Sequence, residues 1–204
     1  MGSGIASELG EELQTLQAKL EALGSGEETP QKKRLREIYN DHQQILLDHQ
    51  EYLKKTATYS EQLEKYPKQL ESLKKRETVP ATATISQARL EKLTPEEMER
   101  HHVAAQADLS DLQNQQQKLA AEINKLRQRA ITVREELASI NTVRTELTEN
   151  PVEARKTTDK KILSALENYQ DAQLQALTDK TRMLELEALV LPNAIEVATL
   201  QEKL

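Results

Sequence analysis

The sequence predicts an all-α protein, namely an elongated antiparallel coiled coil or helical bundle. Two long helices are expected at about residues 31–76 and 95–149, with shorter helices flanking them. Just over half of the 204 residues are Ala, Glu, Lys, Leu or Arg, which is typical of coiled coils and long helices. Aromatic residues make up only 2% of the chain, which disfavours a thick single core. Apolar residues recur at alternating spacings of three and four in both long segments, as in helices packed lengthwise.

This pattern predicts one elongated helical domain over residues 8–204, preceded by an added leader or a disordered start at residues 1–7. The helices are expected at about residues 8–23, 31–75, 86–93, 95–149, 159–191 and 193–204. Short connectors between them favour antiparallel neighbours. We expect the second and third segments to form a hairpin, with the first and fourth packed alongside.

In the first segment, leucines repeat at a spacing of three or four from Leu9 to Leu23. The Gly24-Ser25-Gly26 turn should end that helix, and Thr29-Pro30 should begin the next one. Proline is tolerated at a first helical position because the amide there has no partner.

The second segment carries a longer stripe, which widens at Tyr39, Leu46 and Leu53, so its first half should contact more than one neighbour. The stripe consists of Leu35, Ile38, His42, Ile45, His49, Tyr52, Thr56, Tyr59, Leu63, Tyr66, Leu70 and Leu73. Pro67 lies inside the pattern, and we expect a kink or a short break near Tyr66.

Residues 77–93 read as a connector with a short helical piece that Ser86 would cap. The start of the third segment is defined more sharply. Thr94 and Glu97 have the spacing of a capping box, Pro95 fills the first helical position, and Leu93 can pack on Met98. The helix should end near Asn150-Pro151.

The third segment has twelve stripe positions, of which ten are apolar. They are Leu109, Leu112, Gln116, Leu119, Ile123, Leu126, Ala130, Val133, Leu137, Ile140, Arg144 and Leu147. Gln116 and Arg144 are interpreted as register markers or as contacts to a further helix. A helix of this length would extend for roughly 80 Å.

Small-angle X-ray scattering tests the expected elongation. The maximum dimension should be well above that of a compact globule of 204 residues, because a helix this long does not fit inside such a globule. A scattering profile typical of a compact protein would contradict the expected elongated shape.

The fourth segment should begin near Thr158 or Asp159. Its apolar residues spread around the helix towards its end, which indicates burial on several sides or a missing neighbour. We expect Leu191-Pro192-Asn193 to interrupt it, with a new helix starting at Asn193.

The composition excludes several classes of function. The net charge is −6 without a basic stripe, and the aromatic residues that stack on bases are scarce, so no nucleic-acid partner is expected. No apolar run is long enough to cross a membrane. The chain has no Cys and therefore no disulfide or thiolate metal site. The first seven residues lack the pattern of a signal peptide and read as a leader or a mature end.

His42 and His49 are the most prominent candidate site residues, because both fall on the stripe of the second segment. They can be read as a pH-sensitive or metal-binding pair or as polar residues that set the register of helix packing. Two turns separate them by roughly 10 Å, too far to share one ion unaided. His101 and His102 are expected to be surface or stripe residues.

Other polar groups are interpreted as structural. The carboxylate pairs Glu11-Glu12, Glu27-Glu28, Glu96-Glu97 and Glu135-Glu136 lack a nearby nucleophile or metal-ligand motif, so we read them as solvated faces and helix starts. The tyrosines Tyr39, Tyr52, Tyr59 and Tyr66 are read as core edges or as a contact face. Lys74-Lys75-Arg76 suits a helix terminus. We predict no catalytic residues, cofactor or metal.

The order of these breaks resembles a known family. Its features here are Tyr66-Pro67-Lys68-Gln69-Leu70, the Thr/Pro/Ala connector, the Gln-rich stretch from Gln113 to Gln117, and the Leu-rich end Glu185-Leu186-Glu187-Ala188-Leu189. They are similar to the N-terminal periplasmic helical region, called a porin domain, of MscM/MscK-type mechanosensitive channels of the small-conductance (MscS) superfamily.

The resemblance implies a non-catalytic domain in the Gram-negative periplasm, part of an inner-membrane channel. Its expected partners are other channel subunits or domains, and envelope components. Its expected roles are assembly, envelope contacts or modulation of gating. A second reading is a coiled-coil adaptor or tether, such as a scaffold or a secreted effector, that binds partner helices.

Overall fold

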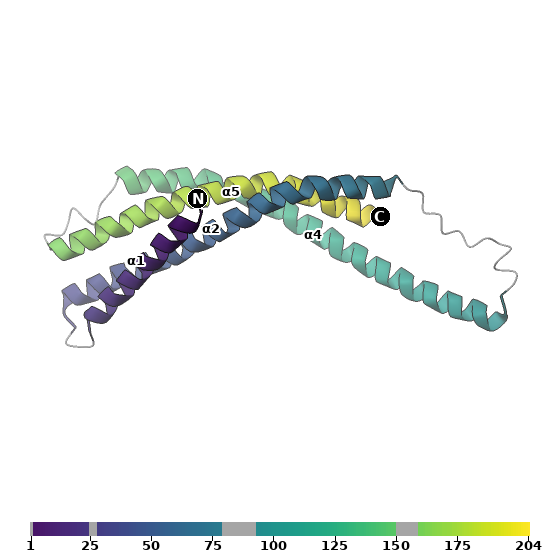
Figure 1. The fold of residues 1–204 in the computed structure, drawn as a ribbon, viewed down its shortest axis with the longest axis horizontal. Coiled ribbons are helices and arrows are strands. Elements are labelled where there is room, and N and C mark those ends of the chain that lie inside the picture. The colour runs from purple at the N-terminus through teal and green to yellow at the C-terminus, as the bar shows by residue number, and fades with distance from the viewer. Residues whose placement is uncertain (1, 25–27, 79–92, 150–158) are drawn as a thin grey trace. The chain divides into compact units, whose positions relative to one another are not determined.

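The computed structural model describes residues 2–24, 28–78, 93–149 and 159–204. These residues form four α-helices and no strand (Figure 1). The helices are α1 (Gly2–Ala22), α2 (Pro30–Glu77), α4 (Pro95–Glu149) and α5 (Lys160–Lys203). The predicted all-α class with two long helices, α2 and α4, is confirmed.

The first helix begins at Gly2, before the expected residue 8. Helix propagation from a docked segment is far easier than nucleation, so the turn ahead of buried Leu9 joins the same helix. At the other end Gly24 adopts a φ of 66°, and its N–H donates to the Glu21 carbonyl at 2.9 Å. Glycine takes this left-handed conformation without a steric penalty, as helix ends often require.

The expected helix starts at Thr29 and Asp159 are confirmed. The Thr29 hydroxyl accepts from the Lys32 N–H at 3.2 Å, and the Asp159 carboxylate accepts from the Lys161 N–H at 2.9 Å. Both side chains thereby satisfy amides that have no partner inside the helix. Thr158, the alternative cap of α5, lies outside the described residues.

The capping box of α4 is confirmed in full. The Thr94 N–H donates to Glu97 Oε2 at 2.8 Å, and the Glu97 N–H donates to Thr94 Oγ1 at 3.3 Å. The hydrogen bond from the Thr94 backbone lowers the pKa of Glu97. The helix ends at Glu149, as Pro151 predicted. The short helix expected at residues 86–93 falls almost wholly outside the described residues.

Neither of the two predicted helix breaks is present, and the kink expected near Tyr66 stays a prediction. Helix α2 runs through Pro67 without a break, and α5 runs through Pro192, so the separate helix expected at residues 193–204 is the last part of α5. A proline removes one backbone hydrogen bond and crowds the preceding turn, at a cost of about 3 kcal/mol. Burial of Leu191 and Ala194 on either side of Pro192 offsets that cost.

The packing divides into two compact units, which are described separately. Unit 1 consists of residues 1–62 and 132–189, and unit 2 of residues 63–131 and 190–204. Helices α2, α4 and α5 each contribute to both units. One domain over residues 8–204 therefore stays a prediction.

In unit 1, helices α1, α2 and α5 share a core (Figure 1). One cluster is formed by Leu9, Leu16, Leu46 and Ala172, and another by Leu35, Ile38 and Ala165. The polar partners of α2 on α5 lie 128 and 130 residues further along the chain, at Gln31–Asp159 and His49–Asp179. This near-constant offset means that α2 and α5 run parallel here.

The end of α4 also packs in unit 1, where Val133 and Ile140 are buried. Arg144 donates to the Thr181 hydroxyl of α5 at 3.4 Å, and Gln170 of α5 donates to the Leu147 carbonyl at 2.6 Å. Residue numbers fall on α4 as they rise on α5, so the two helices are antiparallel. Arg144 is thus a contact to a further helix, one of its two predicted roles.

Unit 2 has its own small core. Leu70 and Leu73 of α2 pack with Val197 and Leu200 of α5, and Tyr66 lies against them. Lys74 Nζ lies 2.7 Å from Glu196 Oε1. This pair is exposed, so it adds little to the stability that the apolar cluster supplies.

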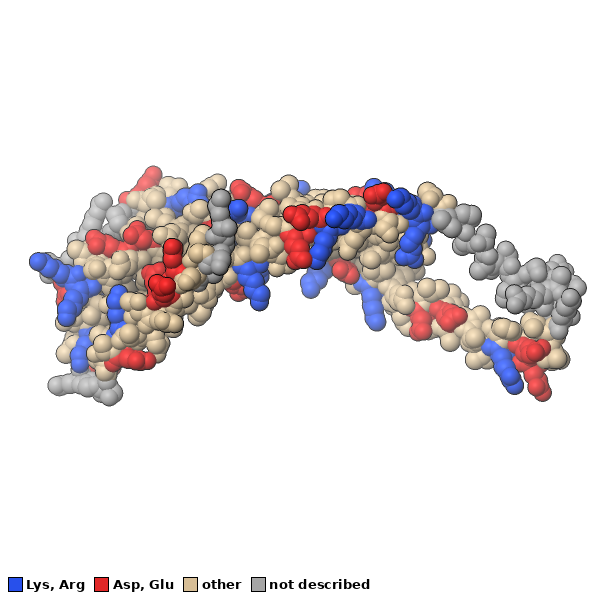
Figure 2. Space-filling model, viewed as in Figure 1, with Lys and Arg blue, Asp and Glu red and all other residues tan. Residues whose placement is uncertain are grey.

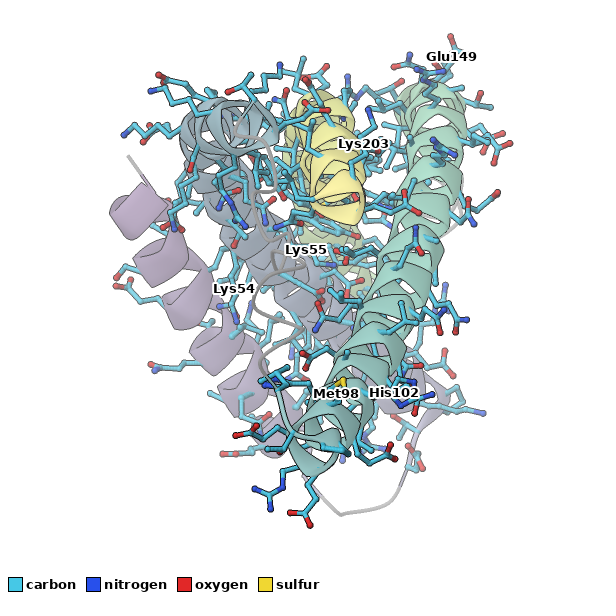
Figure 3. All side chains as sticks on the ribbon, turned by 90° about the vertical axis from the view of Figure 1, so that its right-hand side faces the viewer. Lys54, Lys55, Met98, His102, Glu149 and Lys203 are labelled. Atoms are coloured by element: carbon cyan, nitrogen blue, oxygen red, sulfur yellow. The ribbon has the colours of Figure 1, made fainter. Side chains whose placement is uncertain are left out.

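The stripe predicted on α4 is only partly buried. Ile123 is buried, but Leu109 is 56% exposed and Leu112 is 61% exposed. The first turns of α4, including Met98 and His102, are likewise exposed (Figure 3). The expectation that the stripe is covered from Leu109 onwards is therefore wrong. A three-four pattern identifies a helix face able to pack, but a neighbour must reach that face to cover it.

Candidate functional site

The most unusual chemistry of the described residues lies at His42, where unit 1 brings three helices together. His42 is only 2% exposed. Its Nε2 lies 3.2 Å from Glu12 Oε1 of α1, and its ring centroid is 6.1 Å from that of Tyr169 of α5. The α2 stripe aims the imidazole inwards, because positions 35, 38, 42 and 45 share one face of the helix.

Electrostatics favour the neutral form of His42. Burial lowers the pKa of its side chain below the usual 6.5, and the positive charge of Lys19 acts in the same direction. Glu12 opposes both effects, but its side chain is partly exposed, so water screens its charge. The 3.2 Å contact between His42 Nε2 and Glu12 lacks good hydrogen-bond geometry, so it offsets the effect of burial only in part. An imidazolium here would carry a charge that is poorly compensated.

His49 lies two turns further along α2 and faces a different helix. Its Nε2 is 2.6 Å from Asp179 Oδ2 of α5, and the residue is 2% exposed. Its Nδ1 is buried with no hydrogen-bond partner among the described residues. When Nε2 carries the ring hydrogen, it donates to the carboxylate, and Nδ1 is then a bare nitrogen rather than an unpaired N–H in the core.

The two histidines are not part of a metal-ligand cluster in the described residues. Within the described parts of the chain, no three His, Asp or Glu residues are grouped so that they could hold a metal ion. Each histidine faces a single carboxylate on a different helix. What the arrangement can do is bind or release a proton between packed helices.

The structure places the other sequence candidates at the surface or at core edges. His101 and His102 are exposed on α4, as are Glu11, Glu96 and Glu135. Glu97 forms the cap already described, and Glu27 lies outside the described residues. The four tyrosines of α2 are half-buried, in keeping with core edges, and burial raises the pKa of both Tyr52 and Tyr66.

Lys74, Lys75 and Arg76 lie in the last turn of α2, as predicted for a helix terminus. Lys75 pairs with Glu71 at 2.7 Å. On the face shown in Figure 2, basic and acidic side chains alternate without a broad patch of one sign. No described helix is both long and apolar enough to span a membrane.

A comparison with protein families matches residues 8–204 to the mechanosensitive ion channel porin domain. The chain belongs to this family. The match covers far more than half of the sequence and confirms the resemblance drawn from the order of its breaks. Porin domains of this type are N-terminal helical, periplasmic regions of MscS-superfamily channels such as MscK.

No curated protein and no solved structure matches this porin domain. The family assignment therefore rests on the family match, with the helical architecture consistent with it.

Sequence reasoning missed one site residue of this porin domain, Asp179. It lies on α5, 130 residues from its partner His49, and no local motif marks it. The available signal was a polar residue on α5 opposite a polar position of the α2 stripe. This pairing can be recognised only once the register between α2 and α5 is known.

Proposed function

We propose that this porin domain is a non-catalytic periplasmic module of a mechanosensitive channel, contributing to subunit assembly, to envelope contacts or to the tuning of gating. The observation that carries this proposal is the family membership of residues 8–204. Lengthwise packing of α1, α2 and α5 around Leu46 supports it, because long packed helices give a stiff body that can hold or pass on a displacement.

The role in gating is tested by patch clamp on the full-length channel that contains this domain. Leu46→Asp disrupts the core of unit 1, and Leu47→Asp is the matched control on the exposed side of the same turn. We expect Leu46→Asp to change either the tension that opens the channel or the number of active channels per patch. Leu47→Asp should change neither quantity.

Equal opening tension and equal channel number in wild type and Leu46→Asp would contradict a role in gating or assembly.

The location of the domain is tested separately. This chain has no Cys, so Asn168→Cys adds one exposed thiol to the porin domain of the full-length channel. A membrane-impermeant maleimide should label it in cells whose outer membrane has been permeabilised. Labelling only after lysis would place the domain elsewhere.

A further inference from the structure

His42 lies at the contact between the first helix and the rest of unit 1. Helix α1 is held by Leu9 and Leu16, which pack on Leu46 of α2, and Glu12 lies between these two leucines in sequence. Lys19 extends over the Tyr39 ring at 5.7 Å. The charge state of His42 therefore acts at the interface that holds α1 in place.

The two buried histidines hold different helices. His42 faces α1 through Glu12, whereas His49 faces α5 through Asp179 at 2.6 Å. The two buried histidines of α2 therefore contact two different helices, and the carboxylate on α5 lies closer to its histidine than the carboxylate on α1 does.

Charged and titratable groups around both histidines come from every helix that packs there. Glu12 and Lys19 of α1 act on His42, and Tyr169 of α5 lies against its ring. Asp179 of α5 faces His49. One turn further along α2, Lys180 of α5 lies 5.9 Å from the centre of the Tyr52 ring. The negative charge of Glu136 of α4 contributes to raising the pKa of Tyr52.

The balance at His42 disfavours a proton while α1 is docked. Its Nε2 is buried, and its contact with Glu12 lacks good hydrogen-bond geometry. Lys19 repels an imidazolium, and the carboxylate of Glu12 reaches into solvent. Removing α1 would expose the ring to water and remove both Lys19 and Glu12. Burial is the largest of the effects on the pKa of His42, and its loss outweighs the loss of Glu12. The undocked state therefore binds the proton more readily, and protonation shifts the equilibrium towards it.

We propose that His42 is a proton-sensitive latch: α1 stays packed on α2 at neutral pH and separates from it as the pH falls below about 6.5, while α5 remains in place. The sign follows from linkage. Docking of α1 lowers the pKa of His42. The stabilisation of the docked state by neutral His42 is therefore complete at pH values above the usual histidine pKa, and it is lost as the pH falls through the lowered pKa. This regulation is independent of the proposed role in a channel.

Distance measurements between spin labels test the latch in this 204-residue chain. The absence of native Cys allows two label pairs that share one site. Ala18→Cys with Ala57→Cys reports α1 against α2, and Asn168→Cys with Ala57→Cys reports α5 against α2; all three positions are exposed. From pH 8 to pH 5.5 we expect the first distribution to lengthen and broaden and the second to stay unchanged.

Two substitutions make the result specific. In His42→Gln, which cannot take up a proton, the α1–α2 distribution should be the same at pH 8 and pH 5.5. His102→Gln removes an exposed histidine and should respond to pH as wild type does. A wild-type distribution that does not change with pH would overturn the latch, as would a pH response that survives in His42→Gln.

A second measurement does not require the variant to fold. In wild type, the imidazole signals of the four histidines can be followed by NMR during an acid titration, with the His42 signal identified by single substitutions of the other three histidines. We expect His42 to titrate below the usual histidine value of about 6.5, together with the loss of the α1 contacts. Titration of His42 at or above that value would contradict the proposal.

Discussion

Replacing Leu46 by Asp is expected to lower the free energy of unfolding by at least about 4 kcal/mol. Leu46 is 1% exposed and lies in the cluster shared by α1, α2 and α5. Truncating a buried leucine costs about 2–5 kcal/mol through lost burial and the cavity left behind, and a carboxylate adds the cost of desolvating a charge. Urea denaturation followed by circular dichroism at 222 nm measures the change.

The matched control is Leu47→Asp. Leu47 is the next residue on the same helix and is 46% exposed, so its substitution should change stability by less than about 1 kcal/mol. Similar losses for both substitutions would mean that the packing face of α2 is misassigned.

Replacing Pro192 by Ala is expected to raise the free energy of unfolding by about 2–3 kcal/mol. Pro192 lies inside the continuous helix α5 and is exposed, so little apolar burial is lost. The substitution restores an amide that can donate to the Ala188 carbonyl and removes the clash of the ring with that turn. Thermal and urea denaturation should both show the gain.

A neighbouring substitution separates this effect from a general gain in helix propensity. Glu185→Ala also places an alanine at an exposed position of α5, and it should change stability by only a few tenths of a kcal/mol. If Pro192→Ala destabilises the chain, the proline conformation is part of the packing of unit 2, and our account of its cost is wrong.

Local rules predicted the helix ends well. Thr29 and Asp159 cap their helices, and Thr94 with Glu97 forms the expected box. These contacts join residues two to four apart, so the sequence contains all the information they need. The stripe of α2 was equally readable, since Leu35, Ile38 and Leu73 are buried where the three-four pattern placed them.

The same rules failed where distant segments decide the outcome. A kink or short break was expected near Pro67 and a break at Pro192, but α2 and α5 run through these prolines without a break. A local pattern states what a proline costs, whereas the burial that offsets this cost comes from other helices.

The candidate site shows the same division. Its histidines could be found from the sequence because both interrupt an apolar stripe, and the sequence left open whether they sense protons or set register. Their partners Glu12 and Asp179 come from helices before and after α2. Those partners depend on how α1 and α5 are aligned with α2.

By itself the sequence determined the helical class, the starts of α2, α4 and α5, the face that each part of α2 presents and the resemblance to a channel porin domain, because periodicity and capping act over one or two turns. Only the tertiary structure decided that Leu109 and Leu112 stay exposed, that α5 continues through Pro192, and that His42 and His49 face different helices. These outcomes depend on contacts between residues far apart in sequence, whose alignment no local pattern encodes.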